Sequence, residues 1–145
     1  MKLELHLIPK SCFYENLRLA LGPRWEGVSD KFKASKNYTC EICGYHGNKN
    51  LIHAHEHWEW DDEKHTQTLT KVECVCNICH AVMHWGQSHT RGCNMDELCT
   101  HAAKINGCTK KEFMNHVEES FATWRIRADQ KWIVDFGAFK SYLRG

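Results

Sequence analysis

The sequence has few prolines, no long apolar run and almost no net charge, and two of these deficits exclude a class of protein. Only two of the 145 residues are proline, which is too few for a collagen-like rod or a proline-rich linker. No segment approaches the roughly 20 consecutive apolar residues that span a bilayer, so we expect no membrane partner. The formal net charge of +1 neither favours nor excludes nucleic acid, because a basic face can coexist with an acidic one.

Cysteine and histidine, in contrast, are abundant, with nine cysteines and eleven histidines in the chain. An odd number of cysteines cannot all pair in internal disulfides. Residues 1–10 lack the apolar run of a secretory signal, so we expect reduced thiols in the cytoplasm. Thiolate and imidazole are the side-chain ligands that zinc and its neighbours prefer. The composition therefore predicts a metal-binding protein.

Apolar periodicity and turn residues predict a single α+β domain over residues 1–145 in three sections. The first section is a strand or extended arm in which Leu3, Leu5 and Leu7 alternate with polar residues, followed by an amphipathic helix from Pro23. The middle section contains a hairpin and a helix, and the last contains two helices and a final strand. The sections are residues 1–37, residues 38–86 and residues 87–145.

Local signals refine the middle and last sections. Strands over residues 51–58 and 69–75 predict a hairpin with a long loop, and Asn77 is placed to cap the helix that follows. Asn94 and Thr109 each precede a glutamate by three residues, as in a capping box, and Gly107 separates the two C-terminal helices. Residues 132–136 resemble a strand. We expect the apolar stripe on the last helix to be plain core.

Two Cys-x-x-Cys pairs carry the strongest chemical signal in the chain. Two intervening residues allow both thiolates of a pair to bind one ion, and Gly44 suits the tight turn after the first pair. Cys74 lies two positions from a proposed ligand and could compete with it, because residues two apart on a strand face the same side. The pattern predicts a structural Zn²⁺ held by Cys40, Cys43, Cys76 and Cys79.

Histidines are also patterned, in a way that predicts a second cation. His80 and His84 lie four apart on the expected helix and so share a face. His53, His55 and His57 alternate along the expected strand and point to one side of it. A strand and a helix bearing histidines form a plausible pocket for a divalent metal. The alternative is that some of these rings only hydrogen-bond the backbone around the zinc.

Three stretches of the sequence together resemble the HNH endonuclease motif. They are the string Cys40-Glu-Ile-Cys-Gly, the histidines from 53 to 57, and the string Cys76-x-x-Cys-His-x-x-x-His84. The wider pattern is similar to a bacterial and phage subgroup of small HNH-type proteins. The resemblance implies a zinc-stapled ββα-metal core with a flanking N-terminal helix and C-terminal helices. It also implies metal-dependent hydrolysis of phosphodiester bonds in DNA, with a second divalent ion such as Mg²⁺, Mn²⁺, Ni²⁺ or Zn²⁺ in the active site.

The resemblance also implies residue roles. His55 and His84 fall at metal-ligand positions of the motif, and His80 is the other helix position expected to face the metal. Glu56 stands where the general base, normally histidine, is found. Lys71 aligns with the motif's asparagine and could instead contact phosphate as a point charge. In an alternative register His55 becomes the base and Ala54 falls at a ligand position, which costs the cation one ligand.

These departures from the motif leave a second function open. Asp61, Asp62 and His65 in the hairpin loop could supply missing ligation or base function, or form a solvated acidic loop. The competing hypothesis is a catalytically weak or inert zinc module that binds DNA or a protein partner, as a phage-encoded inhibitor or regulator would. A zinc-dependent deaminase is less favoured, because His57 stands where its His-x-Glu signature needs glutamate.

Overall fold

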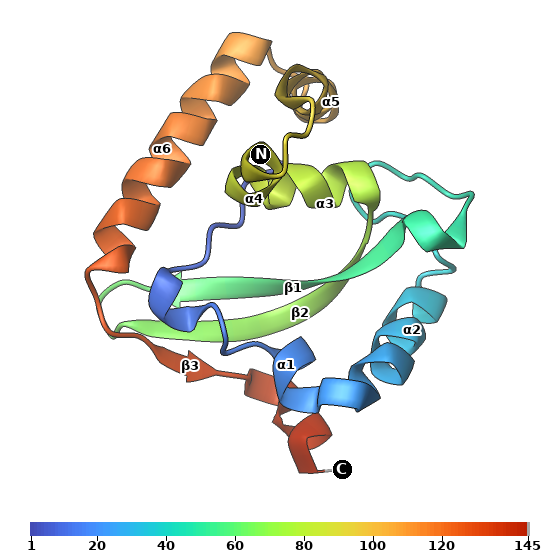
Figure 1. The fold of residues 1–145 in the computed structure, drawn as a ribbon, viewed down its shortest axis with the longest axis vertical. Helices are drawn as coiled ribbons and strands as arrows, with labels where there is room; N and C mark the ends of the chain where they lie inside the picture. The colour runs from blue at the N-terminus through green and yellow to red at the C-terminus, as the bar shows by residue number, and fades with distance from the viewer. Residues whose placement is uncertain (145) are drawn as a thin grey trace.

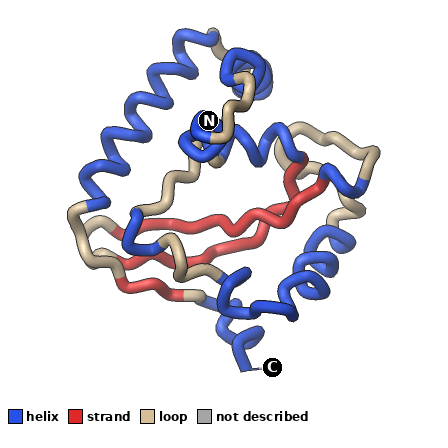
Figure 2. Tube along the Cα trace, viewed as in Figure 1, coloured by secondary structure: helices blue, strands red, loops and turns tan. Residues whose placement is uncertain are grey.

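A long antiparallel hairpin organises the fold in the computed structural model, which describes residues 1–144 (Figures 1 and 2). These residues form six α-helices and a three-stranded sheet of order β1-β2-β3, so the protein is of mixed α+β class. The elements are α1 (Leu17–Leu21), α2 (Trp25–Ser35), β1 (Ile52–Asp61), β2 (Thr66–Cys76), α3 (Asn77–Met83), α4 (Trp85–Thr90), α5 (Met95–Asn106), α6 (Lys110–Ala128), β3 (Ile133–Asp135) and a final 3-10 segment (Gly137–Arg144).

The hairpin is longer and its turn shorter than the sequence predicts. Only residues 62–65 separate β1 from β2, so the expectation of a long loop was wrong. Asp61 explains the difference, because its carboxylate accepts hydrogen bonds from the backbone N–H groups of Glu63 and Lys64 and so closes a tight turn. A bulge between His57 and Trp58 shifts the register towards the turn. Before the bulge, side chains alternate strictly between the two faces.

The N-terminal arm is extended rather than paired as a strand, and it packs against the helices. Leu3 and Leu5 are buried in the core. The side-chain amide of Asn106 donates to the Leu3 carbonyl, and its oxygen accepts from the Leu3 N–H, both at 2.8 Å. Further along the arm, the His6 N–H donates to the carbonyl of Met83 at the end of α3. The arm therefore brings His6 to the region where the hairpin meets α3.

The boundaries of α5 and α6 follow the predicted capping signals, although Asn94 makes only half of a capping box, by accepting from the Glu97 N–H. Thr109 and Glu112 form the expected capping box at the start of α6, and Gly107 ends α5 in the left-handed conformation. Helix α3 differs, because it is capped not by Asn77 but by Cys76, whose sulfur accepts a hydrogen bond from the Cys79 N–H. This cap joins the start of α3 to a candidate metal ligand.

Two hydrophobic clusters hold the hairpin between helices. One cluster joins β2 to α3, α5 and α6, with Phe113 and Val82 fully buried. The other gathers around Leu17, Trp58 and Leu69 and packs α1 and α2 on the hairpin. Figure 1 shows α3 to α5 on one side of the hairpin and α1 and α2 on the other. No helix in residues 1–144 is both long and apolar enough to cross a membrane.

Candidate metal centres

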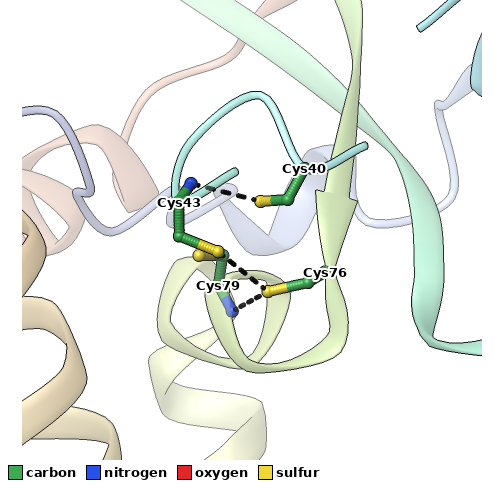
Figure 3. A group of neighbouring side chains, drawn as sticks. All are labelled: Cys40, Cys43, Cys76 and Cys79. Carbon is green, nitrogen blue, oxygen red and sulfur yellow. Dashed lines mark hydrogen bonds between the residues drawn. The ribbon is translucent and has the colours of Figure 1, made fainter. Parts of the chain in front are cut away.

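Four cysteine side chains converge on one point at the open end of the hairpin, away from its turn (Figure 3). Cys40 and Cys43 come from the turn before β1, Cys76 ends β2, and Cys79 lies in the first turn of α3. Their sulfur atoms all lie within 4.8 Å of one another. The Cys43 and Cys76 sulfurs are 3.6 Å apart. Bonds of about 2.3 Å in a tetrahedral zinc site place sulfurs about 3.8 Å apart, so the four could hold a metal such as zinc.

The backbone around this cysteine group is arranged for thiolates. The N–H groups of Cys43 and Cys79 each donate to the sulfur three residues earlier, at 3.4 Å. Gly44 has a φ of 81°, a conformation that favours glycine, as the sequence indicated for this turn. Hydrogen bonds from the Cys76 and Cys79 thiols hold the pKa of Cys40 far below its ordinary value. The same hydrogen bonds raise the pKa of Cys76 to about 11 and raise that of Cys79 as well, so the arrangement favours one thiolate, at Cys40.

Two further residues define the edge of the cysteine group. His101 on α5 places its Nε2 3.2 Å from the Cys79 sulfur, where it can donate to a ligand thiolate. The sequence pattern did not single out His101, because only the packing of α5 on α3 brings it close. Cys74 is buried outside the group, and its N–H donates to the Glu41 carboxylate. It is therefore a core residue rather than a competing ligand.

Three histidines form a second group of donors between the hairpin and α3. His55 comes from the middle of β1, and His80 and His84 come from α3 and its C-terminal cap. One ring nitrogen of each lies within 4.8 Å of those of the other two. His53, two residues before His55 on the same face, contacts His80 through their Nδ1 atoms at 2.8 Å. The structure thus brings together the histidines that the spacing placed on facing sides.

Burial keeps this histidine group uncharged. His55 is only 3% exposed, and desolvation together with the neighbouring imidazoles holds its pKa well below the ordinary value. Desolvation also lowers the pKa of His80 to about 3 and lowers that of His84. A neutral imidazole offers a lone pair, and this is the form that binds transition metals. The group therefore fits a divalent cation by its donor chemistry.

Glu56, expected as the base, is not part of the histidine group. Adjacent residues on a strand point to opposite faces, and Glu56 points towards α1. Its carboxylate accepts hydrogen bonds from the backbone N–H groups of Leu17 at 2.6 Å and Arg18 at 3.5 Å. Burial raises the pKa of Glu56, while these bonds act to lower it. The carboxylate therefore satisfies the first turn of α1.

The remaining loop candidates also lie away from the histidines. Asp61 closes the hairpin turn, and Asp62 forms an ion pair with Arg127 at 3.0 Å. His65 lies against the ring of Trp132. These three residues belong to the far end of the hairpin, where they have structural roles. Lys71 is different, because it lies opposite His57 on the histidine face and pairs with Glu73 at 3.0 Å.

Three tryptophans, two on β1 and one at the start of α4, differ in how far they are buried. Trp58 and Trp85 are each only 6% exposed and belong to the hydrophobic clusters, so neither can stack on a base. Trp60 is half-buried, donates to Gln67 and lies beneath the guanidinium of Arg127. Of these three tryptophans, Trp60 therefore keeps the greatest access to solvent.

The cysteine and histidine groups share α3 and lie at successive positions along it. Comparison of the chain with protein-family models, with curated proteins and with solved structures found no match. The chemistry of the assembled side chains is therefore the basis for a functional assignment.

Proposed function

We propose that the protein is a metal-dependent endonuclease of the HNH type that hydrolyses phosphodiester bonds in DNA. The single observation that supports this proposal most is the convergence of His55, His80 and His84 from a β-hairpin and the helix that follows it. A cysteine group, which we assign to a structural zinc, closes the same hairpin and helix. Both features support the proposal of a ββα-metal core, which the resemblance to the sequence motif implies.

The chain's own residues supply two parts of this proposed site, the metal ligands and a contact for phosphate. When bound, a divalent cation stabilises negative charge on the scissile phosphate and on the leaving oxygen. His55, His80 and His84 hold neutral lone pairs towards one point, in a buried setting where electrostatic interactions are strong. Lys71 projects from the neighbouring strand position, 58% exposed, and is placed to contact a phosphate as a point charge.

One observation favours the second candidate function, a zinc module without catalysis that binds DNA or a protein partner. Glu56, the residue at the base position of the motif, is held at the start of α1 on the other face of the hairpin. A carboxylate committed to backbone N–H groups cannot accept a proton from water at the histidine group. The second candidate therefore predicts metal binding without hydrolysis.

The two candidates differ in a cleavage assay on the full chain. The purified protein is incubated with supercoiled, linear and single-stranded DNA in the presence of Mg²⁺, Mn²⁺, Ni²⁺ or Zn²⁺. We compare it with His84→Ala and with His89→Ala, because His89 is an exposed histidine on α4 that belongs to neither metal group. Retention of the cysteine-bound ion in His84→Ala, seen as the sulfur-to-Co²⁺ absorption of a cobalt-loaded sample, shows that the variant is folded.

The endonuclease proposal predicts cleavage that His84→Ala lowers by about a hundredfold or more and that His89→Ala leaves unchanged. Absence of cleavage on all three DNA forms, with an ion still bound at the histidines of the parent protein, would favour the binding module instead. Cleavage that is equal in His84→Ala and the parent would overturn the assignment of this site.

A further inference from the structure

We infer that His6, His57 and Glu73 form a further site for a first-row divalent transition-metal ion, separate from the cysteine group and from His55, His80 and His84. The three residues come from the N-terminal arm, β1 and β2. Each offers one donor atom, and the three atoms lie within 4.8 Å of one another. This inference concerns metal binding alone, so it does not depend on the proposed nuclease activity.

The hairpin register places the carboxylate and one imidazole on the same face. Glu73 lies opposite His55, and His57 follows His55 by two residues, so His57 and Glu73 are diagonal neighbours. The His57 Nδ1 and Glu73 Oε2 atoms are 3.5 Å apart. The arm then lays His6 across them, with its ring centre 4.8 Å from that of His57. Small rotations of these side chains would bring the donor atoms close enough together to bind one ion through bonds of about 2.1 Å.

The strongest sign of a missing partner is a pair of buried polar atoms. His57 Nδ1 and Glu73 Oε2 are both inaccessible to solvent and find no hydrogen-bond partner among residues 1–144. Glu73 itself is only 6% exposed. Buried polar atoms without partners are rare in folded proteins, because each loses its hydration without compensation. One cation between the two atoms would satisfy both at once.

The charges that face the site leave one carboxylate oxygen for a cation. Lys71 occupies the other oxygen, Oε1, with its Nζ 3.0 Å away. Burial acts to raise the pKa of Glu73, but His57 and Lys71 outweigh it and lower this pKa to about 2, so the carboxylate is ionised. The His6 Nδ1 atom lies 2.7 Å from the His55 Nε2 atom. His6 is therefore the residue of this site that contacts the group of His55, His80 and His84. A simple ion pair of His57 with Glu73 is the competing interpretation.

The site adjoins a cleft, although the His57 Nδ1 and Glu73 Oε2 atoms are themselves buried. His6 and His57 line a cleft of about 460 Å³ between the arm, β1 and α6. Trp60, His116 and Arg127 also line this cleft. Two imidazoles and one carboxylate suit Zn²⁺, Mn²⁺, Fe²⁺, Co²⁺ or Ni²⁺ rather than Ca²⁺, which takes oxygen ligands.

Counting Co²⁺ ions bound by the full chain and by designed variants tests the inference. The stoichiometry is measured by metal analysis after removal of weakly bound ions, and by isothermal titration. Glu73→Gln keeps the shape of the side chain and removes its charge, and His57→Ala is a second variant in case Glu73→Gln folds poorly. Glu59→Gln is the matched control, since Glu59 is an exposed carboxylate on β1 that lines the same cleft.

We expect three ions in the parent protein and in Glu59→Gln, and two in Glu73→Gln, in His57→Ala and in His84→Ala. The double variant Glu73→Gln with His84→Ala should keep one, identified by its sulfur-to-Co²⁺ absorption as the cysteine-bound ion. The inference is overturned if Glu73→Gln and His57→Ala bind as many ions as the parent protein. It is also overturned if the double variant loses no more than either single one, because the imidazoles then form one centre.

Discussion

At the scale of single residues, the alternation of β1 decides which side chains can act together. His55 and Glu56 are neighbours in sequence, yet one faces α3 and the other caps α1. His57, two residues from His55, shares its face and approaches Glu73. A sequence motif does not show that two adjacent residues lie on opposite faces, whereas the geometry of a strand requires it. The residue to test as a base is therefore not chosen by sequence position alone.

Glu56 should matter for stability rather than for the histidine group. We expect Glu56→Ala to lower the free energy of unfolding by about 1–3 kcal/mol, because two backbone N–H groups of α1 lose a charged acceptor. Denaturant unfolding measures this loss, and metal analysis should find the ion at His55, His80 and His84 unchanged. Glu59→Ala, at an exposed position on the same strand, should change stability by no more than about 0.5 kcal/mol.

A different result for Glu56 would restore it as the base. If Glu56→Ala unfolded like the parent protein but lost its DNA cleavage, the carboxylate would have to reach the histidine face in solution. The variant Glu56→Gln separates the roles further. Its amide oxygen can still accept from the Leu17 N–H, so it should regain part of the stability that alanine loses.

At the scale of secondary-structure elements, much of the fold follows from local signals. The alternation of β1 and β2, the capping box at Thr109 and the left-handed Gly107 are readable in the sequence, and each appears in the structure. The length of the hairpin turn was not readable, because it depends on how Asp61 uses its side chain. Nor was the cap of α3, since sequence rules favour Asn77 over a cysteine sulfur.

The parts of the site that sequence reasoning missed are those delivered by separate elements. Glu73 and His101 lie on β2 and α5, and His6 lies on the arm. Nothing in their local spacing marks them as donors. His101 and His6 become neighbours of the metal groups because α5 packs on α3 and the arm crosses the hairpin, and Glu73 does so through its pairing opposite His55. Tertiary packing, which has no periodic signature in the chain, assembles this outer part of the site.

The arm depends on one side chain for its attachment to α5. Asn106 makes hydrogen bonds to both the N–H and the carbonyl of Leu3, as a neighbouring strand would. We expect Asn106→Ala to lower the free energy of unfolding by about 1–3 kcal/mol, because two polar backbone groups in a partly buried setting lose their partners. Limited proteolysis should then cut within residues 1–10 faster than in the parent protein.

Lys104→Ala provides the control for Asn106, because Lys104 is exposed on the same helix. It should leave both the unfolding curve and the proteolysis rate unchanged. If Asn106→Ala also changed neither, burial of Leu3 and Leu5 and the hydrogen bond from the His6 N–H to the Met83 carbonyl would suffice to hold the arm in place. His6 would then be positioned without the pair of hydrogen bonds from Asn106.

At the scale of the whole molecule, α3 connects the cysteine group to the histidine group. We expect the histidine group to depend on the cysteine group, and not the reverse. Cys76 ends β2, contributes to the cysteine group and caps α3 through the Cys79 N–H. His80 and His84 follow on the same short helix. An isolated helix of this length is unstable in water, so its position depends on what holds its ends. The cysteine group holds the end that precedes both histidines.

This arrangement predicts an asymmetric response to the loss of each ion. Cys40→Ser removes a ligand that lies outside α3, in the turn before β1. We expect it to abolish or greatly weaken metal binding at the cysteine group and, through the loosened helix, at the histidine group as well. His84→Ala should remove only the histidine-bound ion. Metal analysis gives the stoichiometries, and hydrogen exchange of the α3 amides reports the state of the helix.

Cys93→Ser is the matched control, because Cys93 is an exposed thiol outside the metal groups, and it should retain every ion. We expect faster exchange of the α3 amides in Cys40→Ser and little change in His84→Ala. Val82 and Met83 are buried in the core and also hold α3 in place, which reduces its dependence on the cysteine group. If Cys40→Ser kept its histidine-bound ion at the parent's affinity, this hydrophobic packing would suffice to position α3, and the two groups would be independent.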